Sequence, residues 1–315
     1  MAAAHLYLFS DACPSDWLVD GQDDVWHTIV NFVFQSDPKL LPFIEQGMSH
    51  EEVLPQDPMY LKFMSKIESQ LPSGQLRKWG TRSGYRHRFC QAFAAAQLEF
   101  KPIISACSFQ EKTLRNSKPA ILASYNRRVG GIEGRGIGFE ESIDRKGRRQ
   151  MRHSFLNFHG YHEIHGPEHQ MLVLLLMAWL IADQFAFFLR DIVTSRRYGF
   201  DQLRLTVVSD KLSGDDDFRR RSERNLRHLI DPEAESAPLV LARSQISDTF
   251  SGDLLADNLA GWMTAAMRDP CGTFGTHARA LIPTGLWTGW HQLQPSASTL
   301  EEISATERLL HVAVA

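Results

Sequence analysis

Short apolar segments separated by longer helical patterns constrain the fold of this chain more than any other feature. Four of them lie at residues 5–10, 25–34, 102–109 and 203–208. Each is rich in leucine, β-branched or aromatic residues and is short enough to form a buried strand. A further strand is expected around residues 239–241. Strands come first, helices and strands then alternate, and helices come last, which predicts an α/β fold with a mixed sheet flanked by helices.

Helical patterns fill most of the intervals between these strands. The expected helices lie at residues 38–47, 83–98, 168–193, 215–230, 253–267 and 299–312. Residues 59–70 fit either a helix or a strand. Residues 127–152 are rich in glycine and arginine and are expected to form an inserted loop. We therefore expect a domain over residues 1–270 that carries the sheet, followed by a C-terminal helical extension over residues 271–315.

Composition and charge narrow the class of protein. The chain has 315 residues and is 43% hydrophobic, which excludes an intrinsically disordered protein. It carries 34 Lys and Arg against 37 Asp and Glu, a net charge of −3. A globally basic nucleic-acid binder is therefore not expected, although a local basic surface remains compatible with this balance.

Cysteine usage and apolar segments bear on the cellular compartment. The four cysteines form no CxxC pair, so neither a zinc knuckle nor a disulfide framework is expected, and free thiols are typical of the cytoplasm. The N-terminus lacks the basic start of a signal peptide. Residues 171–189 approach the length of a membrane-spanning helix. Asp183 within them would be costly in lipid, so a buried helix and no membrane association are expected.

Two acidic residues share one sequence context. Asp11 and Asp210 each follow a serine at the carboxyl end of an apolar strand. A carboxylate in that place is held on a rigid element and is reachable by solvent, and a metal ligand needs both properties. The alternative for Asp11 is a simple turn residue.

Asp257 is the third candidate carboxylate. Asp253, Asp257 and Gly261 recur every four residues on one face of the helix expected at 253–267, while Asp253 also fits the role of helix cap. Together with Asp11 and Asp210, Asp257 could bind one or two Mg²⁺ or Mn²⁺ ions, since such ions prefer oxygen ligands. Two ions could stabilise both the attacking and the leaving oxygen of a phosphodiester displacement.

The same residues carry a resemblance to a known family. The chain resembles the bacterial domain-of-unknown-function 3800 family, a divergent branch of the RNase H-like fold. Leu6–Asp11 is similar to the family's first strand, which ends in Asp, and Leu254–Gly261 is similar to its late Leu-Ala-Asp-Leu-hydrophobic-Ala-Gly segment. The resemblance covers residues 5–268 and implies an RNase H-like mixed sheet with a metal-dependent, nuclease-like activity.

The chain departs from the family pattern at two places. Ala12 and Cys13 stand where the family has Glu-Ser after the first Asp. The middle strand ends in Cys107 and Ser108 where an acid is common, which leaves Glu111 as the nearest substitute. These departures favour an alternative in which the protein is a non-catalytic RNase H-like interaction module that binds a protein partner in a larger complex.

The leading hypothesis is a Mg²⁺- or Mn²⁺-dependent nuclease, or a nuclease-derived protein, of RNase H-like fold that acts on DNA or RNA in a bacterial cytoplasm. Asp11, Asp210 and Asp257 would be the catalytic metal ligands. Arginines near them would bind substrate phosphates, which supply most of the affinity for a polyanion. These substrate-binding candidates are Arg127, Arg128, Arg148, Arg149, Arg220 and Arg224. A third basic group comprises Arg77, Lys78, Arg82, Arg86 and Arg88.

A histidine-rich stretch, His159–His169, is the basis of a second alternative. His162 with His165, or His165 with His169, could bind a transition metal through neutral imidazole, as in a His-based metallohydrolase. The competing interpretation is a polar turn that leads into the helix expected at 168–193. The glycines of residues 130–138 lack the Gly-Lys-Ser/Thr ending of a phosphate-binding loop, so a flexible insertion is favoured there.

Overall fold

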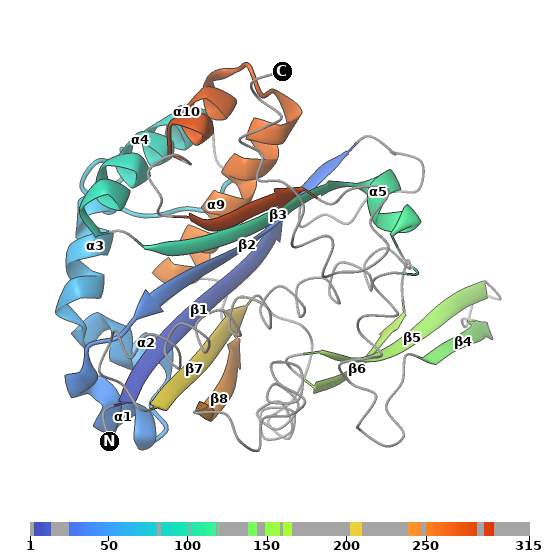
Figure 1. Ribbon diagram of the computed structural model, residues 1–315, viewed down its shortest axis with the longest axis horizontal. Helices are drawn as coiled ribbons and strands as arrows, with labels where there is room; N and C mark the ends of the chain where they lie inside the picture. Colours follow the sequence, from blue (N-terminus) through green and yellow to red (C-terminus); the bar gives the residue numbers. More distant parts are fainter. Residues whose placement is uncertain are drawn as a thin grey trace.

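A mixed α/β fold is built around one large sheet (Figure 1). The computed structural model describes residues 3–13, 25–80, 83–100, 102–117, 119, 138–143, 149–157, 160–165, 202–209, 239–246, 250–281 and 287–292. Within these residues the sheet has six strands in the order β8-β7-β1-β2-β3-β9. Their bounds are β1 (Ala3–Cys13), β2 (Trp26–Gln35), β3 (Ile103–Gln110), β7 (Gln202–Ser209), β8 (Leu239–Ile246) and β9 (Trp287–Gln292).

The pairing of the strands gives the sheet its mixed character. β1, β2 and β3 form an antiparallel meander. β7 lies beside β1 and parallel to it, and β8 continues the parallel arrangement outward. At the opposite edge β9 pairs parallel with β3. The predicted mixed sheet is therefore confirmed, and four of its strands coincide closely with the expected segments at 25–34, 102–109, 203–208 and 239–241.

The first strand is longer than the sequence indicated. β1 does not end at Ser10 but continues through Cys13, and Asp11 pairs with Val30 of β2 inside the sheet. The expectation that Asp11 follows the strand is thus wrong. β1 is longer because the neighbouring β2 provides Thr28, Ile29 and Val30 as pairing partners. The backbone hydrogen bonds between the two strands therefore continue past Asp11.

Helices cover one face of this sheet (Figure 1). In the described residues the helices are α1 (Leu41–Glu45), α2 (His50–Val53), α3 (Pro58–Glu68), α4 (Ser83–Phe100), α5 (Glu111–Asn116), α9 (Ser251–Arg268) and α10 (Thr273–Leu281), with short 3-10 turns η1 (Pro38–Leu40) and η2 (Leu54–Gln56), and of these α3, α4 and α9 pack on the covered face. The expected helix at 38–47 is divided between η1 and α1, although Asp37 does cap it by accepting from the backbone N–H of Lys39. Residues 59–70, which fitted two states, fall mostly in α3.

The core lies between α3, α4, α9 and one face of the sheet. Alternate residues of a strand point to the same face, and Tyr7 and Phe9 of β1 accordingly lie in one buried cluster with residues of these helices. α9 approaches the sheet closely because Gly252 has no side chain. A Cβ at that position would come within 2.4 Å of the Phe9 ring.

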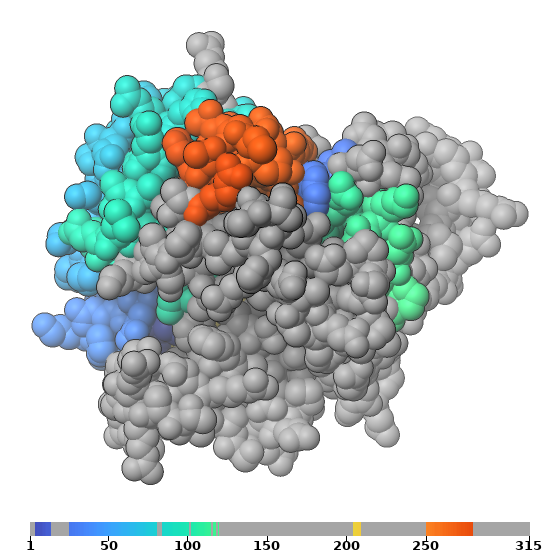
Figure 2. All heavy atoms as spheres, turned by 45° about the horizontal axis from the view of Figure 1, so that its top comes forward, coloured from blue at the N-terminus to red at the C-terminus, as the bar shows by residue number. Residues whose placement is uncertain are grey.

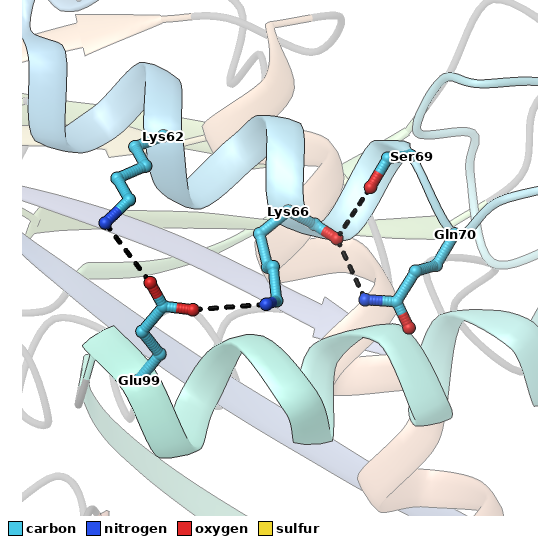
Figure 3. A network of polar contacts seen from close by, with 5 residues as sticks. All are labelled: Lys62, Lys66, Ser69, Gln70 and Glu99. Carbon is cyan, nitrogen blue, oxygen red and sulfur yellow. Dashed lines mark hydrogen bonds and ion pairs between the residues drawn. The ribbon is translucent and has the colours of Figure 1, made fainter.

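α3 and α4 are also joined at the surface. The carboxylate of Glu99 accepts from Lys62 and Lys66, each at 3.2 Å (Figure 3). All three side chains are well exposed, so the network contributes little to stability. The buried residues Phe63 and Phe93, whose rings meet edge to face, are the stronger link between the two helices.

A separate three-stranded sheet corrects the expectation of a loop at 127–152. It comprises β4 (Gly138–Ile143), β5 (Arg149–Asn157) and β6 (Gly160–His165), all antiparallel. The loop was predicted from the glycines and arginines of this region, although the region also contains β-branched and aromatic residues that favour strands. β6 also replaces the polar turn expected at the start of the histidine-rich stretch.

The last part of the chain contributes to the main fold. α10 contacts α9 and α4, and β9 adds a strand to the large sheet, where only helical structure was expected. The helices expected at 168–193, 215–230 and 299–312 lie outside the described residues. Among the residues that are described, no helix is long and apolar enough to cross a membrane.

Candidate functional site

Asp11 lies on the face of β1 that α9 covers. It is two residues beyond Phe9, which belongs to the core, and so points to the same side of the sheet. Its side chain is half-buried, and its Oδ1 accepts a 2.7 Å hydrogen bond from the backbone N–H of Ala12. A partly solvated carboxylate on a central strand is thus held in a fixed orientation.

Asp257 lies in the middle of α9, on the face that meets β1. The Phe9 ring contacts α9 at Gly252, and the hydroxyl of Thr264 donates to the carbonyl oxygen of Cys13 over 3.1 Å. Asp257 precedes Thr264 by seven residues and so shares its side of the helix, the side that meets the end of β1.

The thiol of Cys13 is under the influence of both acids. The pKa of Cys13 is raised to about 11, mainly by burial and also by the negative charges of Asp257 and Asp11, while the hydrogen bond with Thr264 and the charge of Arg268 act to lower it. The charges of Asp11 and Asp257 thus both act on the same thiol, which indicates that two of the three predicted acids lie near Cys13.

Asp210 lies outside the described residues. The residue before it, Ser209, is the last of β7 and is the register partner of Ser10 in β1. In the sequence, Asp11 directly follows Ser10 and Asp210 directly follows Ser209. Each acid therefore comes directly after one of two serines that pair across adjacent parallel strands.

The helix motif around Asp257 receives another segment of the chain, residues 77–79. Oδ2 of Asp257 accepts a 2.6 Å hydrogen bond from the backbone N–H of Trp79. The neighbouring Asn258 donates through Nδ2 to the carbonyl oxygen of Arg77, also over 2.6 Å. One turn on, a Cβ at Gly261 would come within 2.1 Å of the Trp79 indole. The segment 77–79 is thus attached to α9 at Asp257, Asn258 and Gly261. The sequence did not predict this attachment.

Glu111 does not join the two acids. It is the first residue of α5, and its Oε2 lies 3.3 Å from Nε2 of His27. His27 and Val30 are three residues apart in β2 and face opposite sides of the sheet, and Val30 is the partner of Asp11. The His27–Glu111 pair is almost fully buried on the side away from Asp11. Glu111 is therefore not the substitute acid that the sequence left open.

Most of the predicted phosphate-binding arginines lie outside the described residues. These are Arg127, Arg128, Arg148, Arg220 and Arg224. Arg149 is the first residue of β5, paired in register with Ile143. The structure neither joins these arginines to the acids nor separates them. Two basic residues that were not selected, Arg77 and Arg268, do lie beside Asp257 and Cys13.

The histidine-rich stretch is described only in part. His162 and His165 both belong to β6. His159 and His169 lie outside the described residues.

The donor set at the acid pair fits a hard divalent cation, which binds carboxylate oxygens and retains waters. Both carboxylates are half-buried, so such an ion would keep contact with solvent. In the part of the chain that the structure describes, no three His, Cys, Asp or Glu residues gather closely enough to hold a metal ion. Of the three predicted metal ligands, the structure describes Asp11 and Asp257. A third ligand would have to come from elsewhere in the chain, from water or from substrate.

Comparisons with known proteins add no assignment: the chain matches no family model, no curated protein and no solved structure. The site is therefore interpreted from its own geometry.

The least expected residues of the site are Cys13, Thr264 and Trp79. Thr264 could have been found from the sequence, because it follows Asp257 by seven residues and so shares its helix face.

Proposed function

We propose that this protein is a metal-dependent phosphodiesterase of RNase H-like fold, acting on nucleic acid. The observation that carries the proposal is the proximity of Asp11 and Asp257 to the one thiol of Cys13. The strand arrangement supports it: the antiparallel meander β1–β2–β3 with the parallel strands β7 and β8 beside β1 is a mixed sheet, as the RNase H-like expectation has it. The resemblance to the domain-of-unknown-function 3800 family points the same way.

In this proposal each residue has a defined role. Asp11 and Asp257, with Asp210, would hold Mg²⁺ or Mn²⁺, and the metal would polarise a phosphate oxygen and activate a water. The backbone N–H of Ala12 fixes one oxygen of Asp11, and that of Trp79 fixes one oxygen of Asp257. Such fixed carboxylates need no reorganisation when charge develops on the phosphate.

The direct test is cleavage of DNA and RNA by the wild type and by Asp11→Asn and Asp257→Asn, with Mg²⁺ or Mn²⁺ present. Each amide keeps the shape of the carboxylate but loses the charge that attracts the metal. We expect the wild type to cleave and each variant to lose at least a hundredfold in rate. Equal cleavage by all three proteins would reject the roles of both acids.

A second candidate function is a non-catalytic module of the same fold that binds a protein partner. It is favoured by Cys13, a thiol placed among the acids, and by Asp257 serving as an acceptor for the 77–79 segment. Calorimetry with Mn²⁺ separates the two candidates. A catalytic site binds the ion and loses it in Asp257→Asn, whereas a scaffold takes up no ion.

A further inference from the structure

The backbone of the segment Arg77–Lys78–Trp79 is fixed by hydrogen bonds to side chains of two helices. The hydroxyl of Tyr85 accepts from the backbone N–H of Arg77 and donates to its carbonyl oxygen, each over 2.8 Å. Asn258 donates to the same carbonyl. Helices α4 and α9 therefore fix the backbone of Arg77 from two sides.

Trp79 is held in the same way. Its backbone N–H donates to Asp257, and its carbonyl oxygen accepts from Nε of Arg86 over 2.8 Å. The Arg86 guanidinium lies over the Trp79 ring, 5.1 Å from its centre, a cation–π contact. The indole is buried against Gly261. The side chains of Arg77 and Lys78, in contrast, are exposed. The fixed backbone thus presents two cations to solvent next to a candidate metal ligand.

The residues around this segment in the sequence carry basic side chains and no acidic ones. Residues 69–98 contain five Arg and Lys and no Asp or Glu, although the chain as a whole has a net charge of −3. Two acids bond to this part of the chain: Asp257 accepts from the backbone N–H of Trp79, and Oε1 of Glu68 lies 3.4 Å from the backbone nitrogen of Leu76. In Figure 2 the teal surface that includes α4 adjoins the orange surface of residues 250–281, and α10 contacts α4.

We propose that Arg77 and Lys78 form the element that binds the phosphate backbone of a nucleic-acid strand and places it beside Asp257. The inference rests on the proposed function for the nature of the ligand. Two exposed cations on a fixed backbone can each contact a phosphate of the strand, and the Trp79 ring is buried rather than offered to a base for stacking. Binding by this element is therefore insensitive to base sequence.

The test measures binding without cleavage. A fluorescein-labelled single-stranded DNA oligonucleotide of mixed sequence is titrated with protein in EDTA at several salt concentrations, and fluorescence anisotropy is followed. The double variant Arg77→Gln/Lys78→Gln is compared with Lys62→Gln/Lys66→Gln on α3. The second variant removes the same formal charge from exposed side chains whose ion-pair partner is Glu99 of α4.

We expect Arg77→Gln/Lys78→Gln to bind about tenfold more weakly than the wild type. The slope of log K against log salt should fall by about 1.4, since each lost phosphate contact on a single strand contributes about 0.7. The α3 variant should stay within twofold of the wild type. Equal losses in both variants, unchanged binding in the first, or no binding by the wild type would overturn the inference. Because no divalent metal is present, a failure of cleavage does not affect this result.

Discussion

Oδ2 of Asp257 accepts the backbone N–H of Trp79 over 2.6 Å, so the candidate metal ligand is also the acceptor that anchors a basic segment. The two roles place different demands on the side chain. A metal needs the negative charge, whereas the hydrogen bond needs only an oxygen of the right position. Substitutions at Asp257 can therefore separate chemistry from structure.

Asp257→Asn should retain the segment, and Asp257→Ala should lose it. The amide oxygen can still accept from Trp79, so we expect its free energy of unfolding to stay within about 1 kcal/mol of the wild type. Alanine leaves the buried N–H of Trp79 without its acceptor, which costs about 1–3 kcal/mol. Urea denaturation followed by tryptophan fluorescence measures both values. Equal stability of the two variants would show that the hydrogen bond contributes nothing.

Gly261→Ala should destabilise the protein because the new Cβ meets the Trp79 indole at 2.1 Å. Overpacking of this kind costs about 1–3 kcal/mol. Gly84→Ala is the matched control: Gly84 lies in α4, and a Cβ there meets nothing within 4 Å. Alanine is a better helix former than glycine, so the control should be neutral or more stable by up to about 1 kcal/mol. Similar melting temperatures for both variants would contradict the close packing of Trp79 on α9.

Alkylation of Cys13 should report on both acids. Burial, Asp257 and Asp11 raise its pKa from 9.0 to about 11, so at pH 8 the thiolate is about a hundredfold rarer than for an unperturbed thiol. Removing a negative neighbour lowers the pKa, and Asp11→Asn or Asp257→Asn should each increase the rate of reaction with iodoacetamide at this pH. Peptide mass spectrometry follows Cys13, with the exposed Cys271 as the internal reference. Rates that do not change in either variant would place the acids away from the thiol.

Glu111→Gln should affect stability without affecting cleavage. The carboxylate pairs with His27 at 3.3 Å on the sheet face opposite Asp11, and glutamine keeps an acceptor for the ring. We expect a loss of about 1 kcal/mol in the free energy of unfolding and a cleavage rate within twofold of the wild type. A hundredfold loss of cleavage with a stable fold would instead assign Glu111 to the site.

Much of the sheet could be predicted because its strands are short apolar runs whose pattern is local. The strand at 203–208 was found in this way, and so was the helix at 253–267. The extension of β1 through Asp11 and Cys13 could not be predicted, since it depends on pairing with Thr28 and Val30 of a different segment. Local patterns do not reveal such partners.

The candidate site was predictable to a similar extent. Asp11 and Asp257 were selected from their own neighbourhoods, and the structure places both beside Cys13. Asp253 was expected to cap the helix, yet α9 begins at Ser251, and Asp253 is buried in its first turn, 4.0 Å from Nε2 of His50. The attachment of residues 77–79 to α9 joins positions about 180 apart along the chain and has no local sequence signal.

The most direct measurement of the central claim is a crystal structure of the full chain soaked with Mn²⁺ and recorded at a wavelength where manganese scatters anomalously. The account predicts an anomalous peak bonded to carboxylate oxygens of both Asp11 and Asp257, and no such peak in crystals of Asp257→Asn. A soaked wild-type crystal with no peak between these two residues, or with manganese bound only elsewhere, would contradict it.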